Sequence, residues 1–87
     1  MQTYVMAFES THAAMAAQHA LAGAEGFALI PTPTAISAGC GMSLKFCAPT
    51  DEAAGVLART PKEAAGLAAL YRKEGVRPAT YELIERL

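Results

Sequence analysis

Charge is distributed very unevenly along this sequence. Residues 1–43 contain two charged side chains, Glu9 and Glu25, whereas residues 44–87 contain all seven lysines and arginines and six carboxylates. From Gly26 to Leu44 the only ionisable side chain is that of Cys40. A site built in the first half therefore has to rely on backbone groups and helix dipoles rather than on side-chain cations.

Size and composition predict one small globular domain, residues 1–87, with 53% apolar residues. Such a chain buries roughly 60–65% of its unfolded surface. The net charge of −1, with basic residues that do not cluster along the sequence, argues against a nucleic-acid partner. Pro31 and Pro33 interrupt the longest uncharged run, so we expect no membrane span. The chain start lacks the basic segment of a secretion signal, and two cysteines make no disulfide scaffold, which favours a cytoplasmic setting.

Periodicity predicts an alternation of strands and helices. Runs of branched, aromatic or alternating apolar residues indicate strands at Thr3–Phe8, Phe27–Ile30 and Met42–Cys47. Alanine-rich segments indicate helices over His12–Ala24, Glu52–Arg59 and Pro61–Lys73. Pro78–Glu85 is interpreted as a last strand, with a short terminal helix as the alternative.

This order predicts an α+β fold of the ferredoxin-like split β-α-β type (βαββαβ), with a four-stranded antiparallel sheet and helices on one face. The first crossover is right-handed, so a hairpin would place the third strand between the first two. The start of that third strand then lies at the same sheet edge as the end of the first.

The topology predicts that Cys40 approaches the start of the first helix. Ser10 or Thr11 would cap that helix, and His12 follows in its first turn. The unpaired N–H groups of a helix start stabilise an anion, so a thiol there would ionise more readily. His12 could add a proton or a positive charge.

The sequence around Cys40 reads Ser37-Ala-Gly39-Cys40-Gly41. Two glycines leave the sulfur open to a partner and allow positive φ. The alternative is that this segment is only a turn, in which Cys40 has no chemical role. Cys47 lies about 20 Å away along an extended strand, so it is interpreted as a strand-end residue and not as a disulfide partner. The spacing of cysteines and histidines favours no metal site.

A set of short motifs in the first half resembles a known family, the small bacterial selenium/sulfur carrier protein-like domains. The resemblance spans roughly residues 3–47 and rests on Tyr4–Phe8, Ser10-Thr11-His12, Ala14, Pro31-Thr32-Pro33 and Ile36-Ser37-Ala-Gly39-Cys40-Gly41. It implies that Cys40, framed by Gly39 and Gly41, carries sulfur or selenium as a persulfide or selenopersulfide.

We therefore expect a carrier without turnover of its own and without a cofactor. Its partners would be a sulfur- or selenium-donor enzyme and an acceptor protein, and an exposed sheet face is compatible with a homodimer. The alternative is a small protein-interaction or ligand-binding module, because this fold alone does not decide function.

Overall fold

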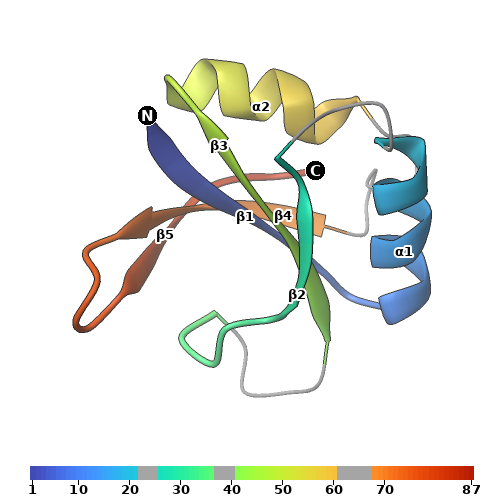
Figure 1. The fold of residues 1–87 in the computed structure, drawn as a ribbon, viewed down its shortest axis with the longest axis horizontal. Helices are drawn as coiled ribbons and strands as arrows, with labels where there is room; N and C mark the ends of the chain where they lie inside the picture. Colours follow the sequence, from blue (N-terminus) through green and yellow to red (C-terminus); the bar gives the residue numbers. More distant parts are fainter. Residues whose placement is uncertain (22–25, 37–40, 61–67) are drawn as a thin grey trace.

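The computed structural model describes residues 1–21, 26–36, 41–60 and 68–87. These ranges contain two helices and five strands (Figure 1). Their bounds are β1 Gln2–Phe8, α1 Thr11–Ala20, β2 Ala28–Pro31, β3 Met42–Ala48, α2 Asp51–Arg59, β4 Ala68–Glu74 and β5 Thr80–Arg86.

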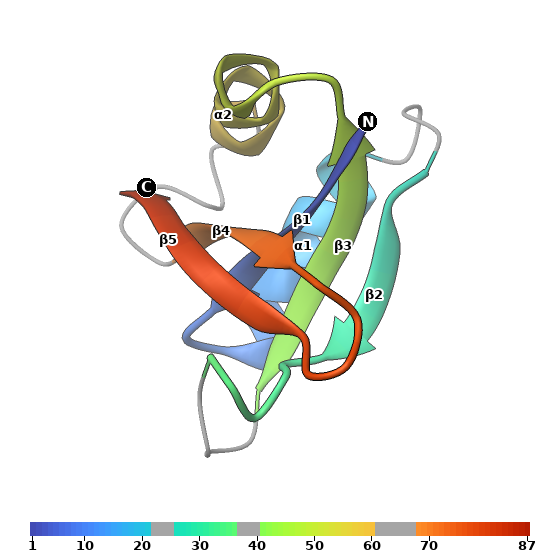
Figure 2. The same ribbon diagram turned by 90° about the vertical axis from the view of Figure 1, so that its left-hand side faces the viewer.

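The five strands form one antiparallel sheet in the order β2-β3-β1-β4-β5. Figure 2 shows β2 and β5 at its two edges. As predicted, β3 lies between β1 and β2, but the strand beside β1 on its other side is β4, which was not predicted as a strand. The α+β class is confirmed, whereas the predicted count of four strands is wrong because β4 adds a fifth.

The error lies in the last of the three predicted helices. Of the predicted helix Pro61–Lys73, the part from Ala68 onward is strand β4, and residues 61–67 lie outside the described residues. Alanine-rich sequence favours helix locally, but pairing with β1 on one side and β5 on the other overrides that preference. The segment interpreted as a last strand, Pro78–Glu85, is β5.

Both helices begin at a capping side chain. Ser10 Oγ accepts a hydrogen bond from the Ala13 N–H (3.0 Å), and Thr50 Oγ1 accepts one from the Ala53 N–H (3.1 Å). Asp51 stands in the first turn of α2, where a carboxylate complements the helix dipole. Helix α1 ends at Ala20, earlier than predicted, and residues 22–25 lie outside the described residues.

Strand β2 continues through Pro31, one residue beyond the predicted strand. Proline cannot donate a backbone hydrogen bond, so it is tolerated where one side of the strand is free. Its position on an edge strand agrees with that requirement.

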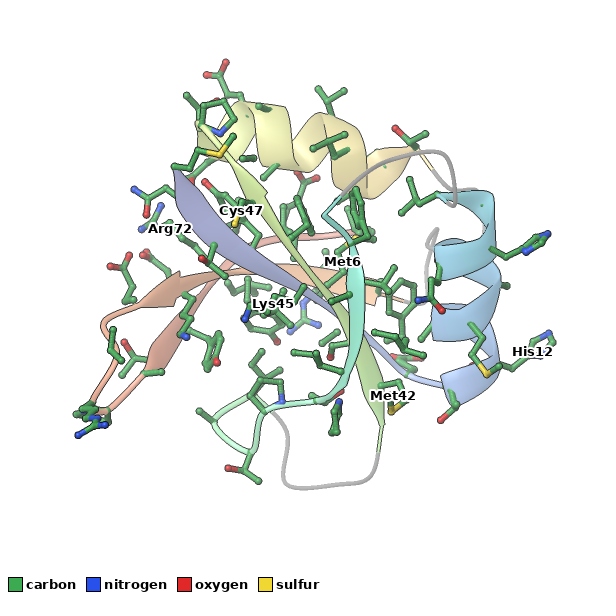
Figure 3. The ribbon with its side chains drawn as sticks, viewed as in Figure 1. Met6, His12, Met42, Lys45, Cys47 and Arg72 are labelled. Carbon is green, nitrogen blue, oxygen red and sulfur yellow. The ribbon has the colours of Figure 1, made fainter. Side chains whose placement is uncertain are left out.

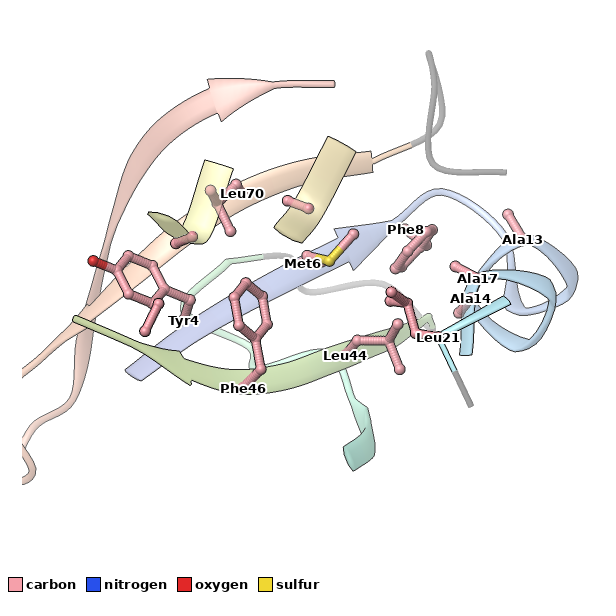
Figure 4. Close-up of a cluster of buried hydrophobic side chains, with 13 residues drawn as sticks. Tyr4, Met6, Phe8, Ala13, Ala14, Ala17, Leu21, Leu44, Phe46 and Leu70 are labelled. Atoms are coloured by element: carbon pink, nitrogen blue, oxygen red, sulfur yellow. The ribbon is translucent and has the colours of Figure 1, made fainter. Parts of the chain in front are cut away.

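One face of the sheet, here called the helix face, packs against both helices. Figure 4 shows Tyr4, Met6 and Phe8 pointing from β1 into this core. The aromatic ring of Phe46 stacks between those of Tyr4 and Phe27, with ring centroids 5.7 and 4.8 Å away. Because the core contains side chains from both α1 and α2, both helices cover this face.

The opposite face, here called the open face, is formed by the alternate strand residues. Register places its side chains in rows across the sheet. One row contains Ile30, Ser43, Ala7, Ala69 and Arg86. The next contains Ala28, Lys45, Val5, Tyr71 and Leu83. Beyond it lie the pair Cys47 and Thr3 and the pair Lys73 and Tyr81.

Candidate functional site

The predicted site divides into residues that the structure describes and residues that it does not. Ser37, Gly39 and Cys40 lie outside the described residues. Gly41, the residue bonded to Cys40, is described, and so are Ser10, Thr11 and His12 of the predicted helix start.

Gly41 lies beside the end of β1. A Cβ atom at Gly41 would stand 3.6 Å from the carbonyl oxygen of Phe8, the last residue of β1. The register agrees, because Ser43 pairs with Ala7. The prediction that the start of β3 meets the end of β1 is therefore confirmed. Gly41 does not have a positive φ, so the expected conformational role of a glycine does not apply at this position.

Thr32 closes the loop that contains Cys40. Its N–H donates to the Gly41 carbonyl oxygen (3.0 Å), and its Oγ1 and the Ser43 Oγ share a hydrogen bond (2.7 Å). Ser43 is fully buried. A turn follows directly, in which the Ile36 N–H donates to the Pro33 carbonyl oxygen (2.9 Å). The two ends of the segment 33–40 are thus held together at Thr32 and Gly41.

The role of Thr32 was not predicted, although the sequence contains a signal for it. Thr32 stands between Pro31 and Pro33, and neither proline has a backbone N–H. Thr32 is therefore the one residue of this tripeptide that can donate a backbone hydrogen bond, and its acceptor is Gly41, the residue before β3.

The start of α1 contributes fewer groups to the candidate site than predicted. Ser10 caps the helix with its side chain, so this hydroxyl is already engaged by the Ala13 N–H. Among the described residues, the N–H groups of Thr11 and His12 have no hydrogen-bond partner. Figure 3 shows the His12 ring on the outer side of α1, pointing away from Met42 at the start of β3. The structure thus keeps backbone donors near this end of the sheet but does not turn His12 toward it.

Cys47 lies at the far end of the strand that Gly41 precedes. It is exposed, and its Sγ is 3.9 Å from Thr3 Oγ1. Because β3 is one unbroken strand from Met42 to Ala48, Gly41 and Cys47 stand at its opposite ends. This arrangement agrees with the interpretation of Cys47 as a strand-end residue.

A second polar cluster, also missed by our sequence analysis, joins four elements on the helix face. The buried Tyr4 hydroxyl donates to Asp51 Oδ1 (2.6 Å), and Arg72 pairs with Asp51, Glu74 and Glu82. Burial, followed by the hydrogen bond to Asp51, raises the pKa of Tyr4 to about 12. The hydrogen bond to Glu74 raises the pKa of Arg72. β1, α2, β4 and β5 all contribute to this cluster, which therefore links these four elements.

A search of the described ranges finds no group of three or more metal-ligating side chains. No helix in the same ranges is long and apolar enough to cross a membrane.

Comparison with known proteins identifies one family. A profile of the family described as "Putative Se/S carrier protein-like" matches residues 3–76. The match includes β1 to β4 and Cys40, and it ends before β5. Comparisons with curated proteins and with solved structures found no match. The profile match spans most of the chain, and this protein therefore belongs to the Se/S carrier protein-like family.

Proposed function

We propose that this protein carries a sulfur or selenium atom on Cys40 between partner proteins. The family match over residues 3–76 is the observation that carries this proposal, because the family's description is that of a carrier and the match includes Cys40. Cys40 is also the one ionisable side chain of the charge-poor segment from Gly26 to Leu44.

The chemistry is an exchange at sulfur. The Cys40 thiolate attacks the terminal sulfur of a persulfide on a donor protein. A new S–S bond forms on Cys40, the S–S bond of the donor breaks, and the donor cysteine leaves as a thiolate. No external oxidant or reductant is consumed, because the transferred sulfur keeps its oxidation state. With a donor selenopersulfide, the terminal selenium is transferred in the same way.

The described residues near Cys40 in the sequence and the fold support the carrier role, because they fix the ends of its segment and offer free backbone N–H groups. Gly41 lies against the Phe8 carbonyl, and Thr32 holds the base of the loop. The free N–H groups at the start of α1 follow Phe8 by only a few residues and could stabilise an anion. No described cation is bonded to these residues, so backbone dipoles would favour the thiolate.

The test is to load the protein with sulfur and weigh it intact. Wild type is incubated with a cysteine desulfurase and cysteine, and separately with inorganic polysulfide. We expect a mass gain of about 32 Da, one sulfur atom, in each case. Cys40→Ser should abolish the gain, whereas Cys47→Ser should retain it.

Two results would contradict the proposal. One is wild type that takes up no sulfur from either donor, and the other is Cys40→Ser that gains as much as wild type. Either result would favour the alternative of an interaction module in which Cys40 is only a turn residue.

A further inference from the structure

Three of the six cations in the described residues lie on the open face. Lys45 of β3, Lys73 of β4 and Arg86 of β5 all point to this side of the sheet, as the register shows. Strand residues on this face include no carboxylate within the described residues. Three basic residues that are far apart in the sequence thus share one face of the sheet.

The helix face differs because its charges are paired. Arg72 is bound by three carboxylates, and Arg59 Nη1 is 2.6 Å from Glu85 Oε1. In contrast, Lys45, Lys73 and Arg86 form no salt bridge with any described residue. Although the whole chain has a net charge of −1, the open face presents unpaired positive charge.

Apolar groups accompany these cations. Leu83 is 43% exposed, and the half-buried rings of Tyr71 and Tyr81 lie on the same face. Accessible aromatic and aliphatic side chains surrounded by charge are typical of a protein-binding surface. The row that contains Arg86 also contains Ser43, which is bonded to Thr32 at the base of the Cys40 loop. The cations thus extend along the open face from the loop base, with Arg86 in the row of Ser43, Lys45 in the next row and Lys73 in the row beyond it.

We infer that the open face docks the protein that loads Cys40, and that this protein contributes an acidic surface. The inference rests on the proposed function and adds the surface and the charge of its partner. Lys45, Lys73 and Arg86 attract the donor, and Tyr71, Tyr81 and Leu83 supply the apolar contact.

A protein fits this face better than a single-stranded nucleic acid does. Nucleic acids bind sheets through exposed aromatic rings on which bases stack. On this open face the central strand β1 presents Val5 and Ala7, and Val5 is buried. Three cations on a chain of net charge −1 are also a weak electrostatic basis for a polyanion.

The test compares sulfur loading by a protein donor with loading by a small donor. The triple variant Lys45→Glu/Lys73→Glu/Arg86→Glu is loaded by a cysteine desulfurase and, in parallel, by inorganic polysulfide. In 50 mM salt, the second-order rate constant for loading by the enzyme should fall about tenfold or more. The loss should shrink at 500 mM salt, and loading by polysulfide should stay within about twofold of wild type because it needs no docking.

A matched control separates the effect of a cation's position from the effect of the change in net charge. Lys45→Glu and Arg77→Glu each replace one exposed cation, but Arg77 lies in the turn between β4 and β5 and not on a strand of the open face. Lys45→Glu should slow loading by the enzyme and Arg77→Glu should not. Circular dichroism checks that the variants fold, which surface changes of this kind normally permit.

The outcomes separate the two proposals. Loading by the enzyme that is unchanged in the triple variant, or reduced equally by Arg77→Glu, overturns the docking surface and leaves the carrier function standing. Wild type loaded by polysulfide but not by the enzyme also overturns it. No loading of wild type by either donor contradicts the carrier function and this inference with it. The single-stranded oligonucleotide dT12 is added as a competitor of loading by the enzyme. If it inhibits loading of wild type but not of the triple variant, the partner of the open face is a nucleic acid and not an acidic protein.

Discussion

The two faces of the sheet are built on different principles. On the helix face, a packed core is bordered by charges that are paired, with Arg72 bound to three carboxylates and Arg59 bound to Glu85. On the open face, the inner strands carry small side chains such as Ala7 and Ser43, and the cations of this face are unpaired within the described residues.

This difference separates stability from recognition. Burial of apolar side chains on the helix face supplies most of the free energy that holds the fold, and the partly exposed ion pairs at its border add little. Unpaired cations on an exposed face contribute little to folding and remain available to a partner. Substitutions in the core on the helix face should therefore affect unfolding, and substitutions of the exposed cations on the open face should mainly affect loading.

The largest expected effect comes from truncating the core. Leu70 on β4 is fully buried on the helix face, so Leu70→Ala removes packing and leaves a cavity. We expect the free energy of unfolding to fall by about 2–5 kcal/mol, measured by urea denaturation. Leu83→Ala on the open face is the matched control. Because Leu83 is 43% exposed, this variant should lose much less free energy of unfolding. Equal losses for the two variants would contradict the difference between the faces.

The next effect concerns the buried hydroxyl of Tyr4. Tyr4→Phe removes the hydrogen bond to Asp51 and should lower the free energy of unfolding by about 1–3 kcal/mol near pH 7. The pKa of Tyr4 is raised from 10.0 to about 12, so the fold favours the protonated hydroxyl. Wild-type stability from this group is therefore present below pH 10 and lost as the pH rises through 12.

Urea denaturation between pH 8 and 12 checks this pH dependence, and the absorbance of tyrosinate follows the titration directly. Between about pH 10 and 12, wild type should lose stability more steeply than Tyr4→Phe, so that the gap between them closes. Parallel curves for the two proteins would show that Tyr4 titrates alike in the folded and unfolded states.

A smaller effect is expected at the base of the Cys40 loop. Thr32→Val keeps the side-chain shape but removes the bond to the buried Ser43 hydroxyl. We expect a loss of about 1–2 kcal/mol, because one buried hydroxyl is left without its partner. A double-mutant cycle with Ser43→Ala isolates this bond, and a coupling energy close to zero would argue against it.

The smallest effect on stability is expected at Gly41. An added Cβ would meet Thr32 Oγ1 at 3.4 Å and the Phe8 carbonyl oxygen at 3.6 Å, and the φ of Gly41 is not positive. Gly41→Ala should therefore change the free energy of unfolding by less than about 1 kcal/mol. A much larger loss, measured in the same urea titration, would mean that the end of β1 lies closer to Gly41 than described.

The sequence predicted the parts of the fold that have strong local signals. The alternation in β3 and the branched, aromatic residues of β1 identified both strands, and the connectivity alone brought Gly41 to the end of β1. Strand β4 was predicted wrongly because Ala68 and Ala69 favour helix in isolation. Only pairing on both sides makes that segment a strand, and no local pattern reports such pairing.

The central residue of the candidate site could be predicted from the sequence, but the side-chain contacts that surround it could not. Cys40 was identified by its glycine neighbours and by family resemblance, and the family is confirmed. The bond of Thr32 to Ser43 and the approach of Arg72 to Asp51 join residues that are 11 and 21 positions apart. Such contacts depend on register between strands and on how α2 packs, which the sequence alone does not specify.

The most direct test of the central claim asks which of the two cysteines carries the sulfur in one and the same molecule. Trypsin cleaves after Lys45, so residues 1–45 contain Cys40 and residues 46–59 contain Cys47. Wild type is loaded by a cysteine desulfurase, alkylated, digested and weighed. The carrier account predicts an added mass of about 32 Da on the alkylated peptide 1–45 and none on the peptide 46–59. Sulfur found on the peptide 46–59, or on neither peptide, would contradict it.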